Sequence, residues 1–97
     1  MATFILLANF TEQGIRNVKD SPKRADAFKE LAQKSGVTVK EIYWTLGSRD
    51  IVAIVEAADA LPVTALGLTL GAQGNIRTET LRAFGKAEMA QILAKMG

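Results

Sequence analysis

Residues 37–57 read VTVKEIYWTLGSRDIVAIVEA, and this stretch decides the fold. Its first part, Val37–Leu46, is rich in the β-branched and aromatic residues that favour strands. Its last part, Ile51–Ala57, is an apolar run of strand length. Gly47–Asp50 lies between them and predicts a tight turn, because glycine and aspartate accept the backbone angles that turns require. The stretch is therefore predicted to form an antiparallel hairpin.

The register of this hairpin determines which of its side chains share a face. If Leu46 opposes Ile51, the pairs on one face are Thr45–Val52, Tyr43–Ile54 and Glu41–Glu56, and those on the other are Trp44–Ala53 and Ile42–Val55. The second set is wholly apolar, so it is expected to lie beneath helices. Trp44 is accordingly interpreted as a core residue.

The segment before the hairpin predicts a strand and a broken helix. Thr3–Phe10 is an apolar run rich in β-formers. Thr11 offers an N-cap hydroxyl for a short helical turn, and Ser21-Pro22 is a second helix start, a cap followed by proline. Gly36 provides the helix stop, and the break is expected near Asp20. The side chains expected to face inward are those of Ile15, Val18, Ala25, Phe28, Leu31 and Ala32.

The segment after the hairpin predicts two helices and a strand. Asp59 caps a helix that runs to about Ala72, and Gly74-Asn75 marks a turn. Ile76–Ala83 is predicted as the last strand, and Lys86–Met96 as a final helix. One stripe of that helix carries Met89, Ile92, Leu93 and Met96.

The element order is βαββαβ with an added C-terminal helix. Two right-handed βαβ crossovers on one sheet predict a single α+β domain, residues 1–97, of ferredoxin-like topology with strand order 4-1-3-2. Strand composition agrees with this order. The two strands predicted as central are almost wholly apolar, whereas the two edges carry the charges that edges usually have, namely Lys40, Glu41, Arg77, Glu79 and Arg82.

The second face of this sheet is also apolar. On the first strand Phe4, Leu6, Ala8 and Phe10 match the helix-covered face. The other face presents Ile5, Leu7, Tyr43, Val52 and Ile54. Leaving these side chains in water forgoes on the order of 10 kcal/mol of burial. A second copy packed sheet to sheet, as a two-fold dimeric α/β barrel, is the expected solution, and a C-terminal helix folded back over its own sheet is the alternative.

Composition excludes several classes of function. The chain of 97 residues contains no cysteine and no histidine, which excludes thiolate chemistry, Ser-His-Asp triads and His or Cys zinc sites. No cofactor and no metal are predicted. A formal charge of +2 does not indicate nucleic acid, and the basic group Arg16, Lys19, Lys23 and Arg24 is interpreted as a solvated helix face. No signal peptide or membrane span is seen, so a cytoplasmic location is expected by default.

Five segments carry a family resemblance. They are TEQGI at 11–15, SPKR at 21–24, Tyr43-Trp44, TLGSRDIV at 45–52 and GNIRTETLRAF at 74–84. Together they resemble the GYD family of small bacterial and archaeal proteins, over nearly the whole chain. The resemblance implies a ferredoxin-like α/β-barrel fold and no established activity. In the turn, Gly47 and Asp50 match the glycine and aspartate of the family's name, but Arg49 stands in place of its tyrosine. A role of that phenol hydroxyl is therefore not carried over.

The candidate site residues fall into three groups. Asp50 and Arg49 either stabilise the turn or bind a polar ligand group at a pocket mouth. If Glu41 and Glu56 are opposed, one carboxyl either holds its proton with a raised pKa, as in an acid/base site, or both are neutralised by Lys40 or Arg77, or they lie at a solvent-exposed strand end. Asn9, Tyr43 and Thr45 either line a small cavity inside the barrel or are hydrogen-bonded core groups. Arg77 has the further option of pairing with Glu79.

Three functions remain open on this evidence. The leading hypothesis is a homo-oligomeric module that binds a small molecule in or beside the barrel. A cofactor-free enzyme of oxygenase or isomerase type, working through carboxylates or Tyr43, is the second. A structural or regulatory interaction protein without a pocket is the third.

Overall fold

The strands form one antiparallel sheet in the order β2-β3-β1-β4, which is the order predicted from the sequence. The computed structural model describes all of residues 1–97. The strands are β1 (Ala2–Phe10), β2 (Thr38–Trp44), β3 (Ile51–Ala57) and β4 (Ile76–Ala83). The ferredoxin-like α+β fold is confirmed, and the bounds of β3 and β4 agree with those predicted.

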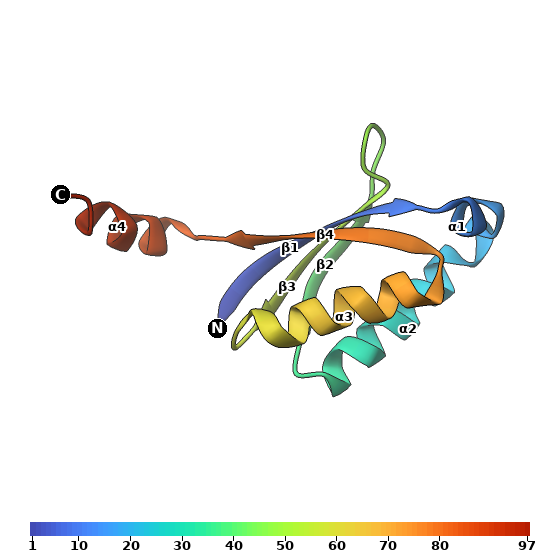
Figure 1. Ribbon diagram of the computed structural model, residues 1–97, viewed down its shortest axis with the longest axis horizontal. Coiled ribbons are helices and arrows are strands. Elements are labelled where there is room, and N and C mark those ends of the chain that lie inside the picture. Colours follow the sequence, from blue (N-terminus) through green and yellow to red (C-terminus); the bar gives the residue numbers. More distant parts are fainter.

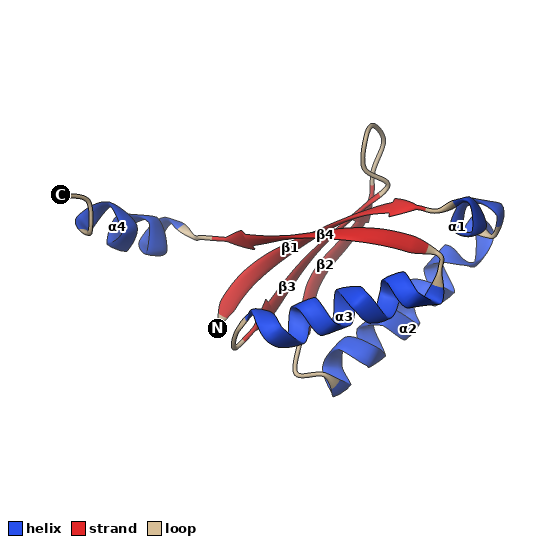
Figure 2. Cartoon of the chain, in the orientation of Figure 1, coloured by secondary structure: helices blue, strands red, loops and turns tan.

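The helices lie on one side of the sheet, apart from the last one (Figure 1, Figure 2). They are α1 (Glu12–Arg16), the 3-10 turn η1 (Val18–Asp20), α2 (Ser21–Lys34), α3 (Ala60–Gln73) and α4 (Lys86–Ala94). The predicted break near Asp20 is present, since η1 separates α1 from α2. The Thr11 hydroxyl accepts from the Gly14 N–H at 3.1 Å and Asp59 Oδ1 accepts from the Leu61 N–H at 2.8 Å, so both predicted caps are made.

Two expectations for the first helical region are wrong. Ser21 is the first residue of α2 and does not cap it; its hydroxyl instead accepts a hydrogen bond from the Trp44 indole. Ile15 is 53% exposed and Val18 is also exposed, although both were expected to face inward. Gly14 is the buried residue of the five-residue helix α1, so the neighbouring Ile15 side chain is left exposed. Val18 lies in η1, none of whose residues is buried.

The hairpin register differs from the predicted one by two residues. Trp44 opposes Ile51, and Glu41 opposes Ile54. The reason lies in the connection, where the Thr45 N–H donates to the Asp50 carbonyl at 2.8 Å, so a wider loop replaces the tight turn. Because the shift is by an even number of residues, the side chains of β2 from Glu41 to Trp44 stay on their predicted faces of the sheet. A bulge at Lys40 then changes the pairing, and Glu56 opposes Thr38.

The core lies between the sheet and helices α2 and α3. Its buried members come from every one of these layers: Phe4, Leu6, Ala32, Val37, Ala53, Val55, Ala57, Val63, Leu66 and Leu70. On β1 the buried residues alternate with half-buried ones, which is the pattern of a strand whose second face is not covered by its own chain.

Helix α4 projects away from the rest of the chain (Figure 1). At its start the Arg82 guanidinium donates to Glu88 Oε2 at 2.9 Å and lies 4.5 Å from the centre of the Phe84 ring. The hydrogen bond from Arg82 lowers the pKa of Glu88. The predicted stripe of Met89, Ile92, Leu93 and Met96 is exposed. The alternative in which α4 covers its own sheet is therefore wrong, and the second sheet face is open. None of the helices has the length and apolar character that crossing a membrane requires.

Candidate functional site

The open face of the sheet brings together most of the side chains predicted as site residues. Its apolar centre is built by cross-strand neighbours, since Ile5 pairs with Ile54 on one side and with Leu81 on the other, and Leu7 pairs with Val52. We call the set Ile5, Leu7, Tyr43, Val52, Ile54 and Leu81 the apolar patch. Tyr43 is 51% exposed and Leu81 is 39% exposed, and the other four are half-buried.

A polar cluster lies at one end of the apolar patch. The Arg49 guanidinium donates to Asn9 Oδ1 at 3.4 Å and forms an ion pair with Glu79. The Asn9 amide donates in turn to the Ser48 carbonyl at 2.6 Å. Since Glu79 is engaged by Arg49, the expected option that it pairs with Arg77 is wrong. Arg77 lies opposite Asn9 on the same face, is exposed, and takes part in no ion pair.

Asp50 and Thr45 support the loop that carries Arg49. The Asp50 carboxylate accepts from the Phe10 N–H at 2.9 Å, and its own N–H donates to the Ala8 carbonyl at 2.9 Å. The Thr45 hydroxyl donates to the Arg49 carbonyl at 2.5 Å. Asp50 therefore ties the loop to β1, which is the structural one of its two predicted roles.

Glu41 and Glu56 do not form the opposed pair expected from the sequence. Glu41 lies opposite Ile54, and Glu56 lies 4.0 Å from the Lys40 ammonium. Lys40 thus supplies the neutralising charge that was one of the alternatives. The prediction that the two carboxylates oppose each other directly is wrong, because the wider loop moves them out of register.

Tyr43 lies beside Glu41 on the same face of β2, two residues along the strand. The negative charge of Glu41, together with a hydrogen bond to its carboxylate, raises the pKa of Tyr43 above the ordinary 10.0. Replacing that carboxylate removes both causes. We expect Glu41→Gln to lower the pKa of Tyr43 back towards the ordinary value.

The chain contains a single tyrosine, so titrating tyrosinate absorbance reports on Tyr43 alone. Glu30→Gln, which alters an exposed carboxylate on α2, is the matched control and is expected to leave the titration unchanged. Equal tyrosine pKa values in the wild type and in Glu41→Gln would contradict the contact.

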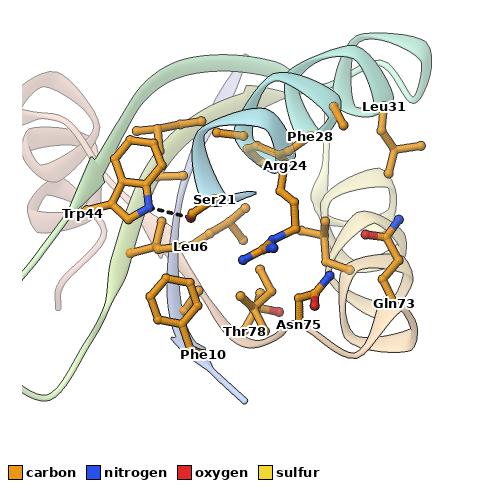
Figure 3. A pocket seen from close by; sticks show the side chains of 18 residues that line it. Leu6, Phe10, Ser21, Arg24, Phe28, Leu31, Trp44, Gln73, Asn75 and Thr78 are labelled. Atoms are coloured by element: carbon orange, nitrogen blue, oxygen red, sulfur yellow. Dashed lines mark hydrogen bonds between the residues drawn. The ribbon is translucent and has the colours of Figure 1, made fainter. Parts of the chain in front are cut away.

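An apolar hollow lies on the opposite side of the sheet from the open face (Figure 3). It is a cavity of about 250 Å³ between α2, α3 and the sheet, and thirteen of its eighteen lining residues are hydrophobic. Trp44 lies at this cavity, 47% exposed, and its indole N–H donates to the Ser21 hydroxyl at 2.8 Å. Trp44 was predicted as a core residue, and that prediction is wrong because α2 leaves part of the ring uncovered.

Arg24 also lines this cavity, and sequence reasoning missed it. It was grouped with three neighbouring basic residues as a solvated helix face, yet it is half-buried. Its guanidinium donates to the carbonyls of Asn17 at 3.0 Å and Gly14 at 3.5 Å. The only sequence signal for this role was the position of Arg24 in the first turn of α2, close to the preceding helical segment whose carbonyls it contacts.

Comparison with known proteins agrees with the architecture. The family model described as GYD domain matches residues 4–93. The chain belongs to the GYD domain family. The resemblance stated from the five segments is therefore confirmed.

A named relative and a solved structure, both from Thermus thermophilus, are similar to this GYD-domain chain. One is named glutamine synthetase and cystathionine beta-lyase binding protein; it is 37% identical over 90 residues, which are 92% of this chain and 95% of that protein. The other is the crystal structure of TTHA0845, with a TM-score of 0.55 and 28% identity over 88% of this chain and 95% of that one. The second comparison supports the ferredoxin-like fold over most of both chains.

Proposed function

We propose that this GYD-domain protein is a binding protein that assembles as a homodimer, with the open faces of two sheets packed against each other. The observation that carries the proposal is the uncovered apolar patch centred on Ile5 and Ile54. Neither α4 nor any other element of the chain lies over it. Two copies related by a two-fold axis would shelter both patches at once, in the form of a dimeric α/β barrel.

The energy available to such a dimer is sufficient but not large. A large apolar side chain contributes roughly 1.5–3 kcal/mol when it moves from full exposure to full burial, and the members of the patch are already about half buried. The patch of one copy therefore supplies on the order of 5–10 kcal/mol, and two copies supply twice that. Association costs on the order of 4–15 kcal/mol. Additional burial would make the dimer secure.

Helix α4 is placed to supply that additional burial. Only Phe84 and Gly85 separate it from the edge strand β4, and it carries the exposed stripe Met89, Ile92, Leu93 and Met96. We propose that α4 of each copy packs on the other copy at the edge of the barrel. Phe84, between β4 and α4, is a further exposed apolar side chain that this packing would cover.

The polar residues of the open face form the proposed rim and a proposed site for a small ligand. Asn9, Arg49 and Arg77 lie at one end, and Glu41, Tyr43 and Glu56 lie along the β2–β3 side. In the barrel these groups would border the space between the sheets, as donors and acceptors beside apolar walls. Thr45 and Asp50 would act by fixing the loop that carries Arg49.

We further propose that proteins are among the partners of this chain. The 37%-identical relative is named for binding glutamine synthetase and cystathionine beta-lyase. An enzymatic function is less favoured by the geometry, because the opposed carboxylates on which it depended are not formed. Binding of metabolic enzymes is thus the function best supported.

The test is direct binding to the two enzymes named for the relative. Biolayer interferometry of the immobilised chain against purified glutamine synthetase and cystathionine beta-lyase is expected to give saturable binding to at least one of them. Serum albumin at the same concentrations is the control. Binding to neither enzyme would contradict the protein-partner proposal and would leave the dimer to be judged by its own measurement.

A further inference from the structure

The hollow between α2 and α3 has a clear origin in the sequence. Helix α2 packs mainly on β2, and α3 packs mainly on β4, so the two helices stand apart above the middle of the sheet. Small side chains line the space between them, with Ala8 and Ala53 on the sheet and Ala25 on α2. Protein interiors are normally packed to the density of organic crystals. A hollow of about 250 Å³ with apolar walls is therefore room for an occupant.

The charge of the hollow indicates what kind of occupant fits. Arg24 is the only charged residue among those that line it, and no aspartate or glutamate is present there. None of the chain's ion pairs includes Arg24, and its guanidinium donates to the two backbone carbonyls of Asn17 and Gly14. A guanidinium has five N–H donors, so donors remain for an anion. Figure 3 shows Arg24 directed into the hollow.

We propose that this hollow is a binding site for a small carboxylate with an apolar body, held with its carboxylate on Arg24 and its hydrocarbon part against Phe28 and the alanines. Carboxylates complement the planar fork of arginine with two parallel hydrogen bonds. Sites for drug-sized ligands have volumes of roughly 300–1,000 Å³, so this smaller hollow fits a short alkyl or single-ring acid. The site lies within one chain and does not depend on the proposed dimer.

Trp44 makes the proposal measurable. It is the single tryptophan of the chain and lines the hollow, so its fluorescence reports on the site without a label. Hexanoate and phenylacetate are the probes, each compared with the alcohol of the same body. Both acids are expected to give a saturable change in Trp44 emission, and the matched alcohols are expected to bind more weakly.

Variants separate the charge from the hollow. Arg24→Gln is expected to weaken the binding of the acids roughly tenfold or more, because it removes their charge-assisted contact. The binding of the alcohols is expected to stay unchanged. Lys23→Gln removes a positive charge from an exposed neighbour on α2, and it is expected to change the binding of neither the acids nor the alcohols. Ala25→Leu keeps Arg24 and a good helix former but fills the hollow, so it is expected to abolish binding of acids and alcohols alike.

Three results would overturn the site. The first is that neither acid gives a saturable change in Trp44 emission, and the second is that the wild type binds acid and alcohol equally well. The third is that Lys23→Gln changes acid binding as much as Arg24→Gln does. Far-UV circular dichroism establishes that each variant is folded. If Arg24→Gln proves unfolded, the Ala25→Leu variant tests the site alone. Acids that still bind to Ala25→Leu do not occupy the hollow, and the proposal would then be wrong.

Discussion

Ile5→Asp is expected to convert the protein from a dimer into a folded monomer. Ile5 is the centre of the apolar patch, flanked by Ile54 on β3 and Leu81 on β4. In the proposed dimer each copy would bury the new carboxylate against the partner's apolar patch, at a cost of several kcal/mol per charge. In the monomer the same carboxylate lies on the open face, where water reaches it.

The measurement is sedimentation velocity together with far-UV circular dichroism. Leu68→Asp makes the same chemical change on α3 at a side chain that is 72% exposed and lies outside the open face, and it is expected to remain a dimer. An Ile5→Asp variant that sediments like the wild type would show that this face is not the interface.

Gly14→Ala is expected to lower the free energy of unfolding by about 3 kcal/mol, the largest loss expected from adding one methyl group to this chain. A Cβ at this position would lie 1.9 Å from the Asn75 carbonyl oxygen, which is backbone and cannot rotate away. That carbonyl accepts from the Thr11 N–H at 3.0 Å, so any shift of the turn also disturbs the connection from β1 to α1.

Urea unfolding followed by circular dichroism measures this loss. Gly71→Ala is the matched control, because a Cβ there meets nothing within 4 Å. It is expected to raise stability by roughly 0.5–1 kcal/mol, since Gly71 lies within α3 and alanine is the better helix former. A Gly14→Ala variant as stable as the wild type would mean that α1 does not pack on the turn after α3.

The order of the strands could be predicted because it depends on composition over whole segments. The apolar runs of β1 and β3 marked the centre of the sheet, and the charges of β2 and β4 marked its edges. The faces were also predicted correctly from β1 and from the hairpin between Glu41 and Val55. An error of two residues in register leaves each side chain on its face, so this level of description tolerates a misjudged turn.

The candidate site was predicted less well because it depends on single contacts. The hydrogen bond from the Thr45 N–H to the Asp50 carbonyl sets the hairpin register in which Glu41 and Glu56 are not opposed. No local sequence pattern predicts a loop of that length. Arg24 and Trp44 were assigned ordinary roles, since the separation of α2 from α3 is a property of tertiary packing. The partners of Ser21 and Glu79 likewise come from distant segments.

The two faces of the sheet have different surfaces and different proposed roles. The open face has the apolar centre of an assembly surface, and the polar cluster of Asn9, Arg49 and Glu79 lies at one end of it. The helix face has a hollow of small-molecule size with one unneutralised charge. Assembly and binding of the apolar carboxylate would then use different residues, which is why Ile5→Asp and Arg24→Gln are expected to affect separate measurements.

Sedimentation equilibrium of the wild-type chain over a wide range of dilution tests the central claim most directly. One chain has a mass of 10.4 kDa. A dimer closed over the apolar patch predicts twice that mass at working concentrations, with dissociation only on strong dilution. A mass of 10.4 kDa at every concentration would show that the open face is left to water, and the proposed barrel would be wrong.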